Sequence, residues 1–314
     1  MKNIIFSTSI LLLMLFCLYA CGNRNSNKSK QDVDHAIIEL KTVFVNNDSI
    51  SYMDIGKGEP VVFVHGTVGD YRVWGAQMDT FAKNHRVIAY SRRYAYPNKQ
   101  IINDSADYSV TVHSKDLIQF LKTLDIGPVH LVGHSYGAFT SLITALEHPE
   151  LLRSLTLGEP PVISLLQNVS DGGNLLNDFG TNVFIPTAEA FKNDDDKKAV
   201  ELFIGGVIGD SLYFSQAPQL KKDIMMDNIL ELRGVVLTKN LFPPLACDYI
   251  KTLKIPVLLL KGDRSPKALT TIIDELATCI ENNELVTLSN SSHGLPYENP
   301  IEFNKVVLDF IHKH

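Results

Sequence analysis

The chain has 314 residues, of which 45% are hydrophobic and 20% are charged, and its formal net charge at pH 7 is -6. This composition is typical of a globular protein long enough for one large domain with an insertion. The negative charge, and the lack of a basic stripe interleaved with aromatic residues, argue against nucleic acid as a partner.

The first twenty residues are predicted to be a signal peptide, because Lys2 precedes an apolar run over 4–19 that is too short for a spanning helix. The run ends in Ala20-Cys21-Gly22, which resembles the lipobox of bacterial lipoproteins. This resemblance implies lipidation at Cys21, whereas a plain secretory signal is the alternative. Residues 21–35 then form the lipidated cysteine and a polar tether. We expect a lipid anchor in a bilayer of the cell envelope, on its periplasmic or surface side.

Beyond residue 35, predicted strands alternate with predicted helices, which indicates a mostly parallel sheet with helices on both faces. Ligands of such sheets bind at the carboxyl ends of the strands. Strands are expected at 37–45, 49–55, 60–64, 86–90, 129–134, 152–157, 255–261 and 284–288, and helices at 71–81, 110–124, 138–148, 267–280 and 300–312.

The alternation breaks down over residues 162–245, where the sequence favours helices and loops. We predict that this segment forms a helical cap over the site. The remaining ranges, 36–161 and 246–314, would then form the α/β core.

One of the expected strands runs directly into Gly133-His134-Ser135-Tyr136-Gly137, and a helix-forming segment follows. A serine between such glycines, on a tight turn from strand to helix, is typical of a nucleophile elbow. His293 lies in a polar loop after the last strand, from which an imidazole can reach back across the strand ends. We therefore predict Ser135 as nucleophile and His293 as its base.

Together with His65-Gly66 after an earlier strand, these motifs resemble those of the α/β-hydrolases with a helical cap, from about residue 37 to the C-terminus. The resemblance implies an eight-stranded sheet. It also implies that the backbone N–H groups of Thr67 and Tyr136 form the oxyanion hole.

Enzymes of this family need an acidic residue that orients the histidine, as the third member of a catalytic triad. The position of this acid departs here from the commonest pattern of the family. In most relatives it stands three residues after the glycine that follows the strand 255–261, and counting from Gly262 gives Ser265, a residue that cannot orient an imidazolium. Asp263 is one remaining candidate. Glu159 is the other and is favoured, because its place after the strand 152–157 is similar to that of the acid in haloalkane dehalogenase-like members.

For several other residues the sequence allows two possible roles. Trp74 and Tyr94, with His65 and Gly66, are expected to line the substrate pocket, although large aromatics commonly serve packing. Arg92 and Arg93 either clamp a substrate carboxylate or brace the loop after their strand.

Cys247 and Cys279 are expected to be buried free thiols, with a disulfide as the alternative. No cofactor and no metal site are expected.

The function that the sequence favours is hydrolysis of a small ester, lactone or related acyl compound through an acyl-enzyme on Ser135. A haloperoxidase, a perhydrolase or a C–C bond hydrolase could use the same three residues. A non-catalytic ligand-binding lipoprotein of the same fold is the alternative from a different class.

Overall fold

The computed structural model describes residues 39–98 and 106–314. The predicted signal peptide, Cys21 and the polar tether lie outside the described residues. Within the described part, no helix is both long enough and apolar enough to cross a bilayer.

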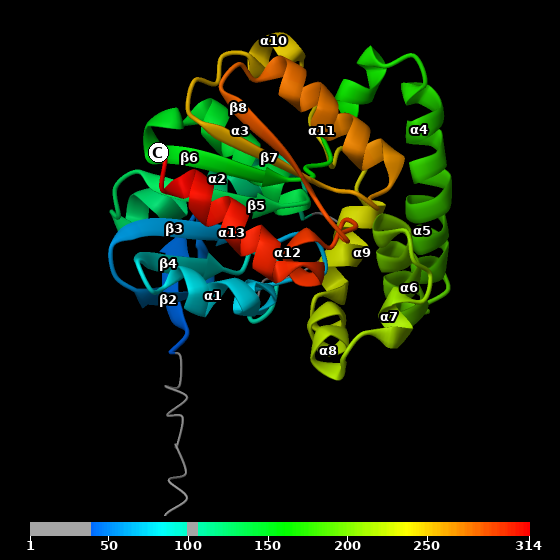
Figure 1. Ribbon diagram of the computed structural model, residues 1–314. Helices are drawn as coiled ribbons and strands as arrows, with labels where there is room; N and C mark the ends of the chain where they lie inside the picture. Colours follow the sequence, from blue (N-terminus) through cyan, green and yellow to red (C-terminus); the bar gives the residue numbers. More distant parts are fainter. Residues whose placement is uncertain (1–38, 99–105) are drawn as a thin grey trace, which may run out of the picture. The chain divides into compact units, whose positions relative to one another are not determined.

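One eight-stranded sheet organises the described chain, and its strand order is β1-β2-β4-β3-β5-β6-β7-β8 (Figure 1). The first two strands form an antiparallel hairpin, β2 pairs antiparallel with β4, and every later pairing is parallel. The predicted α/β-hydrolase sheet is thus confirmed. The strands are β1 (Lys41–Val45), β2 (Asp48–Gly56), β3 (Glu59–Val64), β4 (His85–Tyr90), β5 (Val129–His134), β6 (Leu152–Gly158), β7 (Val257–Gly262) and β8 (Asn283–Leu288).

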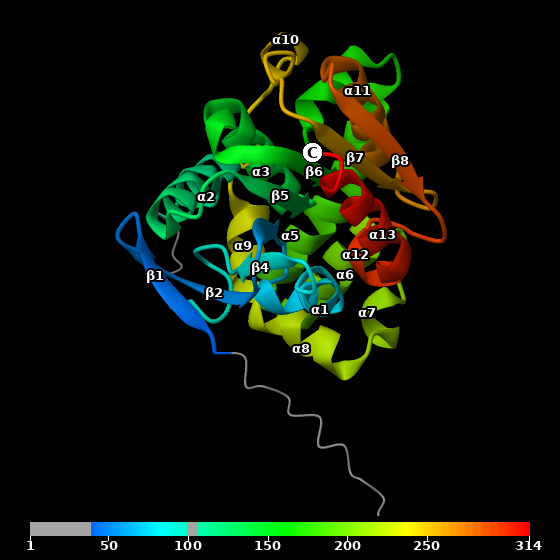
Figure 2. The same ribbon diagram turned by 60° about the vertical axis from the view of Figure 1, so that its left-hand side comes forward.

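Helices cover both faces of the sheet (Figures 1 and 2). Successive side chains of a strand point to opposite faces. In β3, Val62 and Val64 join the hydrophobic cluster that includes α2, α3 and α11, whereas Val61 and Phe63 join the cluster that includes α1 and α13. The helices outside the cap are η1 (Tyr71–Trp74), α1 (Gly75–Phe81), α2 (Val110–Leu124), α3 (Tyr136–Glu147), η2 (Pro149–Leu151), α10 (Cys247–Ile250), α11 (Lys267–Cys279), α12 (Leu295–Glu298) and α13 (Pro300–Ile311).

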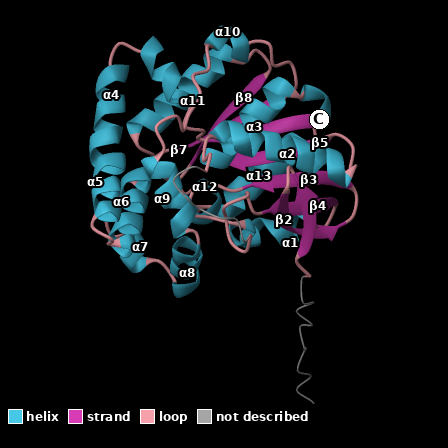
Figure 3. Ribbon diagram, turned by 180° about the vertical axis from the view of Figure 1, so that it is seen from behind, coloured by secondary structure: helices cyan, strands magenta, loops and turns pink. Residues whose placement is uncertain are grey.

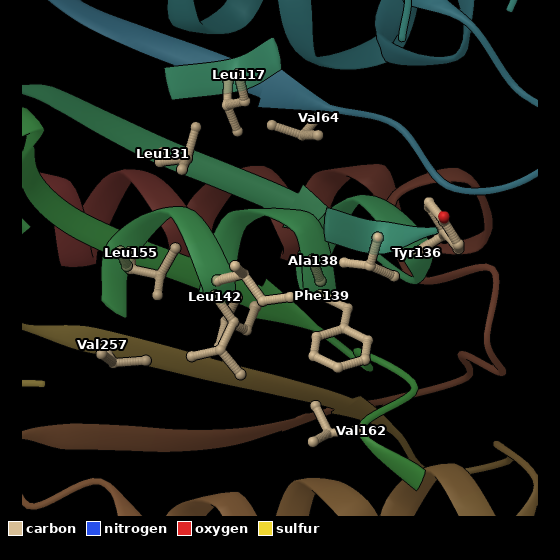
Figure 4. Close-up of a cluster of buried hydrophobic side chains, with 14 of the residues drawn as sticks. Val64, Leu117, Leu131, Tyr136, Ala138, Phe139, Leu142, Leu155, Val162 and Val257 are labelled. Carbon is tan, nitrogen blue, oxygen red and sulfur yellow. The ribbon is translucent and has the colours of Figure 1, made fainter. Parts of the chain in front are cut away.

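Helix α3 is held firmly against the centre of the sheet. Its Phe139 and Leu142 belong to the same buried cluster as Leu131, Leu155 and Val257 of β5, β6 and β7 (Figure 4). Leu131 pairs with Leu155, and Leu155 with Val257, so these strand residues form one row across the sheet. This packing fixes where the N-terminus of α3 lies, and therefore where the turn before it lies.

Between β6 and β7 the chain forms helices and no strand, which Figure 3 shows as a group of helices beside the strands. We call residues 162–245 the cap. It has a hydrophobic cluster of its own, which includes Phe191, Phe203 and Leu232 and also takes in Val68 from the loop after β3. The elements are η3 (Ile163–Asn168), α4 (Gly172–Phe179), the π-helix η4 (Gly180–Phe184), α5 (Ile185–Lys192), α6 (Asp196–Ile208), α7 (Tyr213–Gln216), α8 (Gln219–Asp227) and α9 (Ile229–Leu237).

The two remaining cysteines form a disulfide, so the prediction of free thiols is wrong. Cys247 begins α10 and Cys279 ends α11, and their Cα atoms are 5.2 Å apart, a normal distance for a disulfide. The packing of α10 against α11 brings the two residues together across 32 positions of sequence.

Candidate active site

The turn between β5 and α3 holds Ser135 in an uncommon backbone conformation, with φ +54° and ψ -124°. Non-glycine residues rarely adopt positive φ, and such strain collects at functional sites. Gly133 and Gly137 make the turn possible. A Cβ on Gly133 would lie 2.6 Å from Ala138 Cα, and one on Gly137 would lie 2.3 Å from Val64 O.

Three side chains from separate strand ends form one hydrogen-bonded series. Ser135 Oγ lies 2.9 Å from His293 Nε2, and His293 Nδ1 lies 2.7 Å from Glu159 Oε2. The carboxylate can only accept, so Nδ1 carries the proton and donates to it. Nε2 is then free to accept the Ser135 proton, which is the arrangement that a histidine base needs.

Glu159 is held for this contact by the backbone around it. It follows β6 with φ +47°, and its Oε1 accepts the Gly262 N–H at 2.9 Å while its Oε2 faces His293. The Glu159 side chain is fully buried and that of His293 nearly so. The charge of the carboxylate therefore acts on the imidazole with little screening by water.

Asp263, the other candidate acid, is hydrogen-bonded to the backbone of the loop that carries His293. Its two carboxylate oxygens accept the backbone N–H groups of Asn290 at 3.0 Å and Ser291 at 3.1 Å. It therefore braces the start of the loop that carries His293. Of the two carboxylates, the structure brings Glu159 and not Asp263 to the imidazole.

A second histidine, which in the sequence stands out only as part of the motif around Ser135, supports the loop of His293. His134 Nε2 donates to the carbonyl of His293 at 2.6 Å, and His134 Nδ1 lies 3.3 Å from the Tyr297 hydroxyl. Burial, with a smaller contribution from the charge of His293, lowers the pKa of His134 to about 3. His134 is thus a neutral clamp between the elbow and the loop.

The loop after β3 approaches the elbow closely. A Cβ on Gly66 would lie 3.0 Å from Ser135 Cβ, and Thr67 lines the same cavity as Ser135. Tyr136 is the first residue of α3, where backbone N–H groups have no partner within the helix. The two predicted oxyanion donors, Thr67 and Tyr136, thus flank the serine. Val68 is held at φ +55° there while its side chain packs into the cap cluster.

A cavity of about 300 Å³ opens between the serine and the cap. Its walls are mostly apolar and come from the loop and helices after β3 and from cap helices α6 and α8. Such a cavity suits the apolar part of a small ligand beside a few polar groups. Its apolar lining includes Val68, Val73, Ala76, Phe203, Ile204, Val207, Ile208, Leu220, Ile224 and Met225, and its polar lining includes Thr67, Arg72, His134, Ser135, Tyr213, Lys221, His293 and Tyr297.

His65 and Gly66 are expected to line the pocket, but in the structure they support the loop after β3. His65 is fully buried, accepts the Arg92 N–H on Nε2 at 2.9 Å, and uses Nδ1 to contact the Gly66 carbonyl at 2.8 Å. Burial lowers the pKa of His65 well below 6.5. His65 and Gly66 are therefore part of the loop's framework, and neither lines the cavity.

The two aromatics expected at the pocket belong to packed clusters, so that expectation is also wrong. Trp74 is fully buried, with its ring 4.7 Å from that of Phe63. Tyr94 packs against Tyr108 and His113, at centroid distances of 4.7 Å and 5.8 Å. Their large apolar area is used within the core, as is usual for such side chains.

Arg92 and Arg93 brace loops and do not clamp a ligand. The buried Arg92 guanidinium donates to the carbonyls of His65 at 3.2 Å and Gly66 at 3.1 Å, and it lies 2.8 Å from Glu231 of the cap. Arg93 pairs with Asp48 and Asp116, each at 2.6 Å. Neither arginine lines the cavity.

A parallel sheet that carries a serine on a strained turn, a histidine and a buried carboxylate at its strand ends defines a protein of the hydrolase type. A family model described as alpha/beta hydrolase fold matches residues 59–300. The chain belongs to this family, which confirms the predicted class.

Relatives and solved structures agree with this assignment. The (E)-2-((N-methylformamido)methylene)succinate hydrolase of Acinetobacter baylyi is 27% identical over 117 residues, which are 36% of this chain and 41% of that relative. The chain thus matches less than half of that relative's length. An N-acyl homoserine lactone degrading enzyme, Est816, aligns with a TM-score of 0.69 at 20% identity, over 86% of this chain and all (100%) of that one. The enol-lactonase of Burkholderia xenovorans aligns with a TM-score of 0.68 at 18% identity, over 87% of this chain and 100% of that one. At these identities the structural likeness is one of fold.

Proposed function

We propose that this protein is a serine hydrolase that cleaves a small carboxylic ester, lactone or related acyl compound through an acyl-enzyme. The observation that carries the proposal is the unbroken series from Ser135 Oγ through His293 to the buried Glu159, which opens into an apolar cavity. The names of relatives and neighbours, among them a lactone-degrading enzyme, an enol-lactonase and a thermophilic esterase, support this substrate class.

In the proposed reaction, Ser135 Oγ attacks the acyl carbon while His293 Nε2 takes the hydroxyl proton. The Glu159 carboxylate accepts the Nδ1–H hydrogen bond and stabilises the imidazolium that forms. The N–H groups of Thr67 and Tyr136 receive the negative oxygen of the tetrahedral intermediate. His293 then returns the proton to the leaving alcohol, and a water molecule, activated by the same base, releases the acid from the serine.

The apolar walls from α6 and α8 favour an acyl group with a short or medium hydrocarbon part. Hydrolysis of p-nitrophenyl esters across acyl chain lengths tests this, with Ser135→Ala as the control. We expect turnover that depends on Ser135 and falls off for long chains that exceed a cavity of about 300 Å³. Equal turnover by the folded alanine variant would overturn the proposal.

We also propose that the protein is an exported lipoprotein anchored at Cys21, as its N-terminal sequence resembles a lipobox. The Cys247–Cys279 disulfide supports an oxidising compartment outside the cytoplasm. Metabolic labelling with a fatty-acid analogue in a bacterial host tests the anchor. The label is expected on the wild-type protein and not on Cys21→Ala, and an unlabelled wild-type protein in a host that labels its other lipoproteins would contradict it.

A further inference from the structure

One cation of the cavity forms no ion pair with a carboxylate of the described residues. Lys221 is a partly buried residue of α8 and lines the cavity with Ser135 and His293. Among residues 39–98 and 106–314, no carboxylate forms an ion pair with its Nζ within 4.0 Å. Its Nζ lies over the ring of Tyr297, 5.6 Å from the ring centroid.

The other cation of the cavity is already neutralised. Arg72 Nη2 lies 2.7 Å from Asp70 Oδ2 and 2.8 Å from Asp227 Oδ2, and Arg72 Nε donates to Asp70 Oδ1 at 2.9 Å. Its charge is therefore balanced by two carboxylates of the protein. Lys221 instead lies outside ion-pair distance of the carboxylates that the structure describes; burial lowers its pKa from 10.5, and the more distant charge of Glu298 offsets this effect only in part.

Lys221 also stands at a boundary. Together with Tyr213 and Tyr297 it lines both the apolar cavity and a second cavity of about 400 Å³. The second cavity is polar and includes Arg264 and Glu298. Glu298 accepts the Ser292 hydroxyl at 2.9 Å, and its charge acts on Lys221 only from beyond ion-pair distance. The ammonium thus marks the place where the apolar cavity meets polar surroundings.

We propose that Lys221 binds a carboxylate of the substrate, and that the substrate class is an acyl ester or lactone that carries a carboxylate besides the bond to be cleaved. This inference rests on the proposed hydrolase function. A desolvated ammonium beside apolar walls favours an anionic group at the end of a hydrocarbon chain, since a charge-assisted hydrogen bond there is stronger than one exposed to water.

The test compares two substrates that differ by one charge: the mono-p-nitrophenyl ester of adipic acid and its neutral methyl ester. The readout is the ratio of kcat/KM for the acid to that for the methyl ester. Lys221→Met is expected to lower the ratio by about tenfold to a hundredfold, the range of one charge-assisted hydrogen bond, and mainly through KM. Lys221→Arg is expected to restore most of the ratio.

Lys222→Met is the matched control. It removes the same charge from the neighbouring position of α8, but Lys222 Nζ donates to the Ser215 carbonyl at 2.8 Å and lines a different cavity. Its ratio is expected to equal that of the wild type. An equal fall in both methionine variants would mean that overall charge sets the preference, and an unchanged ratio in Lys221→Met would mean that Lys221 contacts no carboxylate. Either result overturns the inference, while turnover of the methyl ester dependent on Ser135 leaves the hydrolase proposal standing.

A binding measurement keeps the inference testable without turnover. In the Ser135→Ala variant, calorimetry is expected to detect binding of the mono-p-nitrophenyl ester of adipic acid. In the double variant with Lys221→Met as well, this binding is expected to be at least about tenfold weaker. No binding by the single variant, or equal binding by both, would contradict the inference.

Discussion

Exchange of Glu159 for glutamine tests the candidate triad most selectively, because the structure allows no good substitute for the carboxylate. One oxygen faces His293 Nδ1 at 2.7 Å and the other accepts the Gly262 N–H at 2.9 Å. A glutamine has one oxygen and one NH2 group. If the oxygen stays with Gly262, the NH2 group faces Nδ1 and favours the tautomer with the proton on Nε2, which cannot accept the Ser135 proton. If the amide turns round, NH2 meets the Gly262 N–H, and two donors face each other.

The size of the effect follows from the loss of the correct tautomer and of the charge that stabilises the imidazolium. The matching exchange in the serine protease triad lowers kcat by about 10⁴-fold, and we expect a comparable loss for Glu159→Gln. Asp263→Asn is the matched control, since Asp263 binds the backbone of Asn290 and Ser291 and not His293. An asparagine keeps one of the two acceptors, so we expect a fall in kcat of less than about tenfold, because one neutral hydrogen bond contributes about 1 kcal/mol.

The assay is steady-state hydrolysis of p-nitrophenyl butyrate by wild type and both variants, with circular dichroism to show that each is folded. A larger loss in Asp263→Asn than in Glu159→Gln would refute the reasoning. So would a folded Glu159→Gln variant with nearly wild-type kcat.

Three further predictions concern stability. Burial raises the pKa of Glu231 from 4.5 to about 7 despite the nearby Arg92, so the folded protein keeps a proton that the unfolded chain releases. The stability that this proton contributes is lost as pH rises from about 4.5 through 7. The free energy of unfolding in urea, measured across that pH range, is expected to depend less on pH in Glu231→Gln than in the wild type. An equal pH dependence in both proteins would show that other groups cause it. Cys247→Ser is expected to lower stability by about 2–4 kcal/mol, and equal Tm values for variant and wild type would argue against the disulfide. Gly137→Ala would place a Cβ 2.3 Å from Val64 O and is expected to destabilise the fold by about 1–3 kcal/mol or more; a Tm equal to that of the wild type would contradict this.

Strand periodicity predicted the fold well because each buried parallel strand reads as a short apolar run bounded by turn residues. The same reasoning located the candidate catalytic residues. Residues that directly follow parallel strands meet at one edge of the sheet, and the structure brings Ser135, Glu159 and His293 together there. The choice between Glu159 and Asp263 needed the structure, because it depends on the direction of each side chain.

The cavity could not be read from the sequence. The sequence offers Trp74 and Tyr94 as residues that line the pocket or pack in the core, and residue type does not distinguish these two roles. The cap residues Phe203 and Lys221 line the cavity because of how α6 and α8 fold over the serine, and no pattern in the cap marks that geometry. Cys247 and Cys279 are likewise joined by helix packing that their spacing does not reveal.

The most direct test of the central claim is whether Ser135 is an activated nucleophile. Treatment with a fluorophosphonate, followed by mass spectrometry of the digested protein, is expected to show one phosphonyl adduct on Ser135, and much slower labelling in His293→Ala. Absence of an adduct in the folded wild-type protein, or labelling at the same rate without His293, would contradict the account.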